Sequence, residues 1–408
     1  MLRSFEIERF RTFSHLRIEQ LGRVNLVVGR NNVGKSMLLE ALRLYATGGH
    51  PAVIANLLYE RDEVLVGGEP LEESRQPFVD LQALFHGGQA QVGQEGAIRI
   101  GACKRQRMEG DVDELGAIQI LDSWALRLQL DPVGKAGSVG LYVEGEGPYF
   151  RFAQREPVED PRVPYVLSVF QGDQYTYSLT VLDLSRYHRR FARSYPTPPT
   201  PPFVVPQGVN SRVMAQQWDA VTLRQAEERV KECLRIVAPV EKIGGVKHPR
   251  GDQDRMFIAW LPGTGPLALK SLGDGMVRVF QVALALESAA YGEESGNGPG
   301  RQLTFFSDSL PRPGARMLLI DEIENGIHYT LLPELWRFIL GVAKLRDVQV
   351  FATTHSWDCV EAFQTAASQE EEAEAVLIRL ERKGETHQAV TFTQQELSIV
   401  TRDGIEVR

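Results

Sequence analysis

One stretch of the sequence has the residue types and the spacing of a phosphate-binding loop. Residues 29–36 are Gly-Arg-Asn-Asn-Val-Gly-Lys-Ser, which fits the pattern G-x-x-x-x-G-K-S/T. The glycines of this pattern allow a tight backbone turn whose successive N–H groups point at phosphate oxygens. Lys35 is expected to reach the β- and γ-phosphates, and the Ser36 hydroxyl to hold Mg²⁺. The residues of this loop that we expect to bind nucleotide are Gly29, Asn31, Asn32, Gly34, Lys35 and Ser36.

The segments on either side of the loop favour this interpretation. Residues 24–28 form an apolar run that is typical of a buried strand, and residues 35–45 carry apolar side chains at helical spacing. A loop between a strand and a helix places phosphate at the helix N-terminus, where free N–H groups and the helix dipole favour an anion. The alternative is a plain Gly/Asn turn between a strand and a helix.

A second apolar run supplies the carboxylates that a nucleotide–magnesium site needs. Residues 317–320 are Met-Leu-Leu-Ile and are followed directly by Asp321 and Glu322. Ligands of open α/β sheets bind outside the carboxyl ends of the strands, which is where these acids are expected to lie. We expect Asp321 to hold Mg²⁺ and Glu322 to act as general base on the attacking water. The alternative is a strand that ends in two exposed acids.

Two further features could complete such a site. Residues 348–353 predict another buried strand, and His355 follows it. Ser271 and Gly273 precede a predicted helix over residues 275–291, which would make a second anion site at a helix start. On their own, these features would also fit a turn histidine and a simple helix N-cap.

Length and composition limit the class of protein. The chain has 408 residues, of which 43% are apolar and 24% charged, as in an ordinary globular protein of two or three lobes. A net charge of −8 argues against a uniformly basic nucleic-acid coat. Cys103, Cys233 and Cys359 are isolated, which argues against a zinc site or a disulfide framework. Without an apolar leader or a membrane-spanning run, we expect a cytoplasmic protein.

Periodicity predicts the remaining elements. Strands are expected at residues 5–10, 16–19, 97–101, 124–130, 149–152, 177–181, 256–260, 376–380 and 389–392, and helices at 216–234 and 331–345. The proline-rich segment 195–206 is expected to be an extended linker or an ordered loop.

These motifs together resemble the ABC-type ATPase heads, over about the first quarter and the last third of the chain. Residues 29–36 resemble Walker A, residues 320–322 Walker B with its catalytic glutamate, residues 270–275 the ABC signature, and His355 the switch histidine. The resemblance implies an α/β fold with a parallel core sheet, an N-terminal antiparallel β-subdomain and an inserted mixed α+β lobe. We therefore divide the chain into residues 1–95 and 266–408, the two parts of the ATPase core, and residues 96–265, the inserted lobe.

Within this group the two ends of the chain resemble different relatives. Residues 10–13, Phe-Arg-Thr-Phe, resemble an element of RecF-type and SMC-type heads whose basic residue, here Arg11, contacts nucleotide. Residues 321–328 and 351–356 resemble the D-E-x-E-x-x-L/I-H and F-x-T-T-H-S elements of OLD-type ATPases. Gln82 is the candidate for the Q-loop glutamine. The long heptad region of SMC proteins is missing, and no Toprim nuclease domain like that of OLD proteins fits the sequence.

The resemblance implies ATP and Mg²⁺ as cofactors and a homodimer or higher homo-oligomer with ATP sandwiched between copies. One copy would contribute residues 29–36, Asp321, Glu322 and His355, and the other Ser271 and Gly273. We expect a nucleotide-dependent switch that controls a separately encoded nuclease or toxin, as in anti-phage defence systems of the PARIS type.

Two alternatives remain open at this point. One is a RecF-like, DNA-binding ATPase of DNA repair, which would use a basic groove. The densest basic runs are residues 104–107 and 186–190. The other is a scaffold that binds ATP and assembles with little turnover.

Overall fold

The fold was obtained as a computed structural model. It describes residues 1–63, 79–103, 126–132, 140–144, 151–155, 165–172, 174–180, 184, 201–209, 211–247, 255–290, 316–370 and 373–402. Of residues 140–144, 151–155 and 400–402 only the backbone is considered.

The centre of the fold is a six-stranded sheet with the order β10-β14-β15-β3-β16-β17. Its strands are β3 (Val24–Val28), β10 (Phe203–Val204), β14 (Met317–Ile320), β15 (Gln349–Thr353), β16 (Ala375–Lys383) and β17 (Thr386–Thr393). The first five strands in the order run parallel, and β17 pairs antiparallel with β16. The predicted parallel core sheet is therefore confirmed.

An eight-stranded, mainly antiparallel sheet stands beside this core, with the order β2-β1-β4-β5-β8-β9-β6-β7. Its strands are β1 (Phe5–Phe10), β2 (Phe13–Ile18), β4 (Ile98–Gly101), β5 (Leu126–Pro132), β6 (Gly140–Glu144), β7 (Arg151–Arg155), β8 (Tyr165–Gln171) and β9 (Gln174–Leu179). The expected N-terminal antiparallel sheet is thus present, and strands from the middle of the chain extend it. A third sheet consists of β11 (Lys242–Lys247), β12 (Arg255–Trp260) and β13 (Pro266–Ala268).

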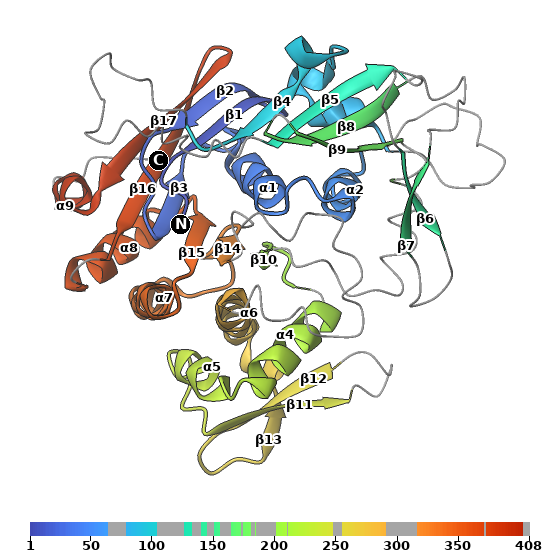
Figure 1. Cartoon of the computed structure of the whole chain (residues 1–408). Helices are drawn as coiled ribbons and strands as arrows, with labels where there is room; N and C mark the ends of the chain where they lie inside the picture. The colour runs from blue at the N-terminus through green and yellow to red at the C-terminus, as the bar shows by residue number, and fades with distance from the viewer. Residues whose placement is uncertain are drawn as a thin grey trace, which may run out of the picture.

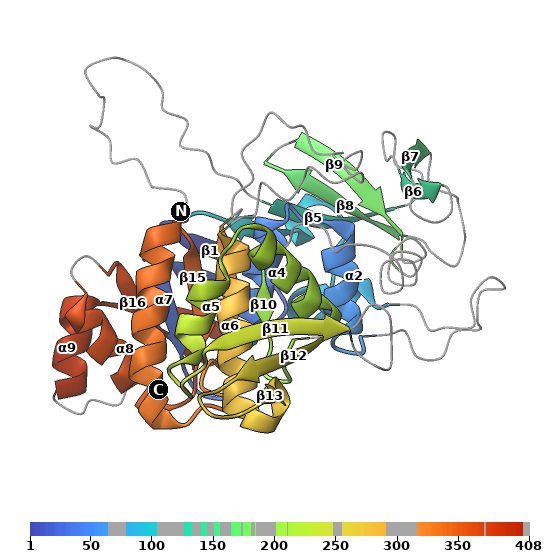
Figure 2. The ribbon, with the colours of Figure 1, turned by 90° about the horizontal axis from the view of Figure 1, so that it is seen from below.

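Helices cover both faces of the core sheet. The α-helices are α1 (Lys35–Ala46), α2 (Pro51–Tyr59), α4 (Ser211–Leu223), α5 (Glu227–Leu234), α6 (Asp274–Ala289), α7 (Leu332–Arg346), α8 (Trp357–Gln369) and α9 (Gln394–Arg402). Short 3-10 helices are η1 (Leu81–Leu84), η2 (His86–Gly88), η3 (Gln94–Gly96), η5 (Leu269–Leu272) and η8 (Tyr329–Leu331). Figure 1 shows α1 and α2 between the antiparallel sheet and the core sheet, with α6 and α7 on the opposite face. In Figure 2, α4, α5, α6 and α7 lie in front of that face.

The two faces of the core sheet belong to two separate hydrophobic cores. Leu318 and Ile320 of β14 pack into the core of α4–α8, whereas Met317 and Leu319 pack into the core of α1, α2 and the antiparallel sheet. Successive side chains of a strand point to opposite faces, so a strand that is covered on both sides must be apolar throughout. This is why residues 317–320 form an unbroken apolar run.

The helix predicted over residues 216–234 is two helices in the structure. Residues 224–226 separate α4 from α5, and Gln225 has a left-handed φ of 55°. Trp218 and Val221 of α4 and Val230 of α5 all pack into the core that contains α6. The break allows both short helices to lay their apolar faces on α6, which one straight helix would not achieve.

The proline-rich segment enters the core sheet at its edge. Of residues 195–206, those before residue 201 lie outside the described residues. Phe203 and Val204 form β10, which pairs parallel with β14. An edge position suits this segment because proline cannot donate a ladder hydrogen bond. The division of the chain at residues 95 and 265 stays a prediction. In the part of the chain that is described, no helix is long and apolar enough to cross a membrane.

A buried histidine on β17 predicts a pH-dependent stability. His387 is 6% exposed, its ring meets the ring of Phe13 edge-on at 5.1 Å, and neither ring nitrogen has a hydrogen-bond partner among the described residues. Burial, with Arg382 and His86 nearby, lowers the pKa of His387 below 6.5. Unfolding therefore takes up a proton between the folded pKa and 6.5, so stability is lost as the pH falls through this window.

We expect His387→Leu to flatten this part of the stability profile. The measurement is urea unfolding of both proteins at about pH 8 and about pH 5.5, on either side of the ordinary histidine pKa. An equal loss of stability in wild type and His387→Leu at the lower pH would contradict the assignment.

Candidate functional site

The predicted phosphate-binding loop lies between β3 and α1, and both of its glycines are required by their surroundings. Gly29 has φ 148° and Gly34 has φ 100°. A Cβ atom would lie 2.6 Å from the Leu380 carbonyl oxygen at Gly29 and 2.6 Å from Phe13 Cζ at Gly34. The loop is therefore held between β2 and β16, and neither glycine position has room for a side chain.

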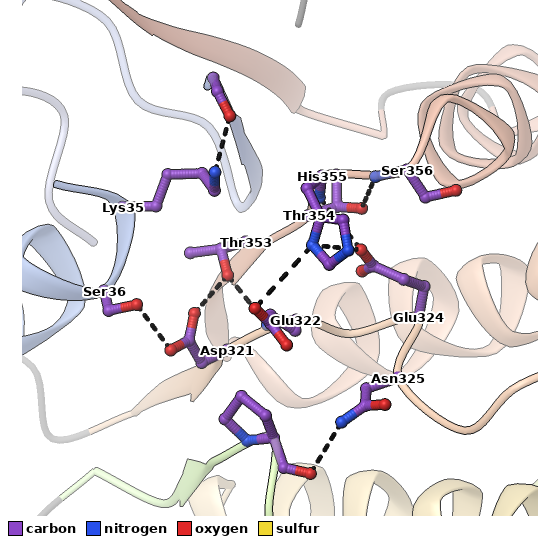
Figure 3. A network of polar contacts seen from close by, with 12 residues as sticks. Lys35, Ser36, Asp321, Glu322, Glu324, Asn325, Thr353, Thr354, His355 and Ser356 are labelled. Atoms are coloured by element: carbon purple, nitrogen blue, oxygen red, sulfur yellow. Dashed lines mark hydrogen bonds and ion pairs between the residues drawn. The ribbon is translucent and has the colours of Figure 1, made fainter. Parts of the chain in front are cut away.

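Lys35 and Ser36 begin α1 and point to the carboxyl end of the core sheet (Figure 3). Lys35 Nζ donates to the carbonyl oxygens of Gly29 at 2.6 Å and Arg30 at 3.2 Å. Ser36 Oγ donates to Asp321 Oδ2 at 2.8 Å. Burial lowers the pKa of Lys35, while the nearby charge of Asp321 acts in the opposite direction. The structure thus brings together the two motifs that sequence analysis assigned to nucleotide and metal.

Asp321 is fixed by hydroxyl groups on both sides. It is 8% exposed, and its Oδ1 accepts a hydrogen bond from Thr353 Oγ1 at 2.5 Å, opposite the bond from Ser36. Thr353 Oγ1 also accepts from the backbone N–H of Glu322 at 2.9 Å. Serine hydroxyl and carboxylate oxygens are hard ligands of the kind Mg²⁺ prefers, so this pair fits a magnesium ion that keeps several waters.

Glu322 and His355 face each other at the open side of this edge. Glu322 has a left-handed φ of 47°, and its side chain is 40% exposed. His355 Nδ1 lies 3.9 Å from Glu322 Oε1 and 3.2 Å from Glu324 Oε1. Glu324 Oε1 also accepts the backbone N–H of His355 at 3.0 Å. Glu324 therefore holds His355 by both its ring and its backbone, as Figure 3 shows.

The remaining predicted residues lie around this cluster or apart from it. Asn31 and Asn32 are exposed on the loop, and Asn32 has a left-handed φ of 62°. Ser271 lies in η5 and Gly273 directly before α6; both are exposed. Among the described residues, no hydrogen bond joins either of them to the phosphate-binding loop of the same chain.

Arg11 takes part in a buried charge network. Its guanidinium pairs with Glu40 of α1 and with Glu63, both at 2.5 Å, and its side chain is 3% exposed. Glu40 also pairs with Arg61 at 2.6 Å. This network ties the turn between β1 and β2 to α1, and the predicted contact of Arg11 with nucleotide stays a prediction.

Sequence analysis missed two residues that support the site. Thr353 binds both Asp321 and Glu322. Its signals were its position at the end of an apolar strand and its place in the F-x-T-T-H-S-like element at residues 351–356, but no role was assigned to it. Arg278 of α6 donates to the backbone carbonyls of Asp321 and Glu322, and no local pattern indicated this contact. The two basic runs at residues 104–107 and 186–190 lie outside the described residues.

Comparison with known proteins yields a family match over part of the chain. Residues 218–358 match a family model described as "AAA domain, putative AbiEii toxin, Type IV TA system". The matched part contains the signature-like residues, Asp321, Glu322 and His355, and does not contain the loop at residues 29–36. This segment is therefore similar to an AAA-type ATPase domain.

The similarity to a curated protein is short. A segment of 45 residues is 42% identical to an uncharacterized protein of Methanocaldococcus jannaschii, and it covers 11% of this chain. The same segment spans 20% of the length of that protein.

Among solved structures the chain is similar to heads of SMC proteins at low identity. The Smc head bound to the C-winged helix domain of ScpA aligns with a TM-score of 0.48 and 11% identity, over 96% of this chain and 97% of that one. The Smc head from Pyrococcus furiosus gives 0.44 and 10%, over 99% of both chains. The SMC head from Thermotoga maritima gives 0.39 and 12%, over 96% and 98%. Because these scores are below 0.5, the description of the fold rests on the strand order and register given above.

The position of Thr353 predicts a specific effect on the magnesium requirement. Thr353→Val keeps the shape of the side chain but removes the hydrogen bonds to Asp321 and Glu322. Loss of a group that orients a metal ligand costs about 10–100-fold in metal affinity or activity. We expect the Mg²⁺ concentration for half-maximal nucleotide hydrolysis to rise by about tenfold or more.

Thr354→Val is the matched control for this experiment. Thr354 is equally buried, and its Oγ1 accepts the backbone N–H of Ser356 at 3.0 Å instead of touching Asp321. The control should keep the wild-type requirement for Mg²⁺. Equal requirements in the two variants would show that Thr353 does not orient Asp321.

Proposed function

We propose that the protein binds and hydrolyses ATP as an ABC-type ATPase that uses Mg²⁺. The observation that carries the proposal is the 2.8 Å hydrogen bond between Ser36 Oγ and Asp321 Oδ2, with Lys35 beside it. This contact joins a phosphate-binding loop to the carboxylate end of a parallel strand, which is the arrangement expected of a nucleotide–magnesium site. The match of residues 218–358 to an AAA domain supports the same function.

Each residue of the cluster has a role in this proposal. The N–H groups of the loop and Lys35 bind the phosphates, and Ser36 and Asp321 hold the metal ion. The bound Mg²⁺ would neutralise charge on the phosphate oxygens. Glu322 takes the proton of the attacking water, because its exposed carboxylate lies next to Asp321 at the open side of the site. His355, held by Glu324, would lie at the γ-phosphate end.

ATP hydrolysis is proposed to need two copies of the chain. Ser271 and Gly273 are exposed at the start of α6 and make no hydrogen bond to the described loop of their own chain. In a homodimer they would approach the nucleotide of the second copy, where the helix N-terminus favours the phosphate charge. ATP would then lie between the copies and stabilise their association.

We propose Gln207, instead of Gln82, as the Q-loop glutamine at the edge of the core sheet where Asp321 lies. Gln82 is exposed on η1, which lies next to the turn at Arg11. Gln207 is also exposed, and it follows β10, the strand that runs parallel to β14 at the edge of the core sheet. The carboxyl ends of parallel strands meet at one edge, so Gln207 lies on the same side as Asp321.

The biological role is proposed to be control of an effector that another gene encodes. The description of the family that matches residues 218–358 contains the words "putative AbiEii toxin, Type IV TA system", which associates a domain of this type with toxin–antitoxin systems. The proposal of a separate nuclease or toxin, as in anti-phage defence, rests instead on the resemblance of residues 321–328 and 351–356 to OLD-type ATPases. Hydrolysis would remove the phosphate contacts between the two copies and so shift the population of the assembly.

Glu322→Gln tests both the chemistry and the assembly. The amide keeps the size of the side chain but cannot take a proton, so turnover should fall by about 10²–10⁴-fold. The variant should still bind ATP and remain dimeric in its presence, measured by light scattering after size-exclusion chromatography. Glu334→Gln changes an exposed side chain of α7 and serves as the control. It should retain ATPase activity, and its dimer should dissociate as ATP is consumed.

The alternatives predict different outcomes of the same experiment. Equal, slow hydrolysis by wild type and Glu322→Gln would favour an assembly scaffold. Stimulation of hydrolysis by duplex DNA, with binding that weakens steeply as salt is raised, would favour a DNA-repair ATPase. If the wild-type protein did not bind ATP, the proposed function would be wrong.

A further inference from the structure

A buried arginine joins the helix that follows the signature-like residues to the carboxylate end of the core sheet. Arg278 lies in the second turn of α6 and is 4% exposed. Its guanidinium donates to three backbone carbonyl oxygens: Val205 at 2.6 Å, Asp321 at 2.7 Å and Glu322 at 2.9 Å. One side chain therefore fixes the backbone of the proposed metal ligand, Asp321, and of the proposed general base, Glu322.

The three carbonyls belong to two neighbouring strand ends. The ladder of β10 and β14 closes with hydrogen bonds from Leu319 N to Pro202 O at 3.0 Å and from Asp321 N to Val204 O at 2.8 Å. Arg278 binds the next carbonyl oxygen along each strand, those of Val205 and Asp321, where the backbone hydrogen bonds between β10 and β14 end. It thereby continues the connection between the strands beyond the last backbone hydrogen bond.

The geometry requires an arginine at this position. The planar guanidinium presents several N–H groups in a fixed fork, so it can serve three separate acceptors at once. A lysine ammonium is a single point of charge and would not reach all three carbonyls. Burial lowers the pKa of Arg278 to about 10, and the charges of Asp321, Glu324 and Glu322 oppose this effect. The negative charges of these three acids therefore stabilise the buried cation of Arg278.

The start of α6 is in direct contact with the same region. A Cβ atom on Gly275 would lie 3.0 Å from the carbonyl oxygen of Gly326, and one on Gly326 would lie 3.6 Å from Asp274 Cβ. Asn325 Nδ2 in turn donates to the Pro206 carbonyl oxygen at 2.9 Å. The first two turns of α6, the turn at residues 325–326 and the segment after β10 are thus packed and hydrogen-bonded as one unit.

We propose that Arg278 is a positioning residue that couples the two nucleotide sites of a dimer of this chain. The proposal rests on the function proposed above, in which Ser271 and Gly273 meet the nucleotide of the second copy. A nucleotide bound there shifts the start of α6, and Arg278 transmits this shift to the backbone of Asp321 and Glu322. Each copy thereby adjusts its own metal ligand and base according to the occupancy of the other site.

Coupling of this kind has a measurable signature. Couplings between sites typically change affinity by about 5–150-fold, which gives a Hill coefficient above 1 for two equivalent sites. In wild type we expect the rate of ATP hydrolysis to depend on ATP concentration with such a coefficient. In Arg278→Lys we expect the coefficient to fall to about 1. We expect kcat to fall by about tenfold, because Arg278 supports the proposed metal ligand Asp321. Equilibrium binding of ATP to the Glu322→Gln/Arg278→Lys protein should persist.

Val279→Ala separates coupling from stability. Val279 is the next residue of α6, and its side chain is fully buried in the hydrophobic core of α4–α8. The melting temperatures of both variants are measured with the kinetics. We expect Val279→Ala to lower the melting temperature and to keep the wild-type Hill coefficient.

The outcomes distinguish the coupling from the function on which it rests. A wild-type protein that hydrolyses ATP with a Hill coefficient of 1, or an Arg278→Lys variant that keeps the wild-type coefficient, overturns the coupling and leaves the ATPase function intact. If Val279→Ala lowers the Hill coefficient together with the melting temperature, the coupling is also overturned. A wild-type protein that neither binds nor hydrolyses ATP overturns both.

Discussion

The hydrogen bond between Ser36 and Asp321 depends on the parallel register of three strands. Val27 of β3 stands opposite Thr353 of β15, and Ile320 of β14 stands opposite Ala352. The strands therefore end at nearly the same level, and the residues that follow each of them meet at one edge. A shift of one residue in either pairing would turn the side chains to the other face and separate the hydroxyl from the carboxylate.

The loop and the carboxylates are both held in conformations that an isolated segment would not adopt. Gly29 and Gly34 have no room for a Cβ atom because Leu380 and Phe13, from opposite ends of the chain, lie against them. Glu322 has a left-handed φ, and its N–H is fixed by Thr353. Such conformations persist only when the surroundings enforce them. The geometry of the site is therefore a property of the whole fold rather than of the motifs.

This dependence explains which parts of the site could be predicted from the sequence. The loop at residues 29–36, the acids at 321–322 and the strands before them carry local signals, since a glycine pattern and an apolar run are read within a few residues. Thr353 and Arg278 act through contacts with residues 32 and 43 positions away, respectively, and no local pattern reports such contacts. The same limit applies to the antiparallel sheet, because its eight strands come from separate segments, and to the helix break at Gln225, which depends on packing against α6.

Two further contacts support the carboxylate end of the core sheet. On one side, β10 extends the core sheet, and the carbonyl oxygens of Val205 and Pro206, which follow it, accept hydrogen bonds from Arg278 and Asn325. On the other side, Thr353 fixes the Asp321 side chain. If only their own strand held these carboxylates, a nucleotide bound at the start of α6 could not change their position. Because a single guanidinium in α6 binds the backbone of Asp321 and Glu322, a displacement of the helix start is expected to move both residues with it.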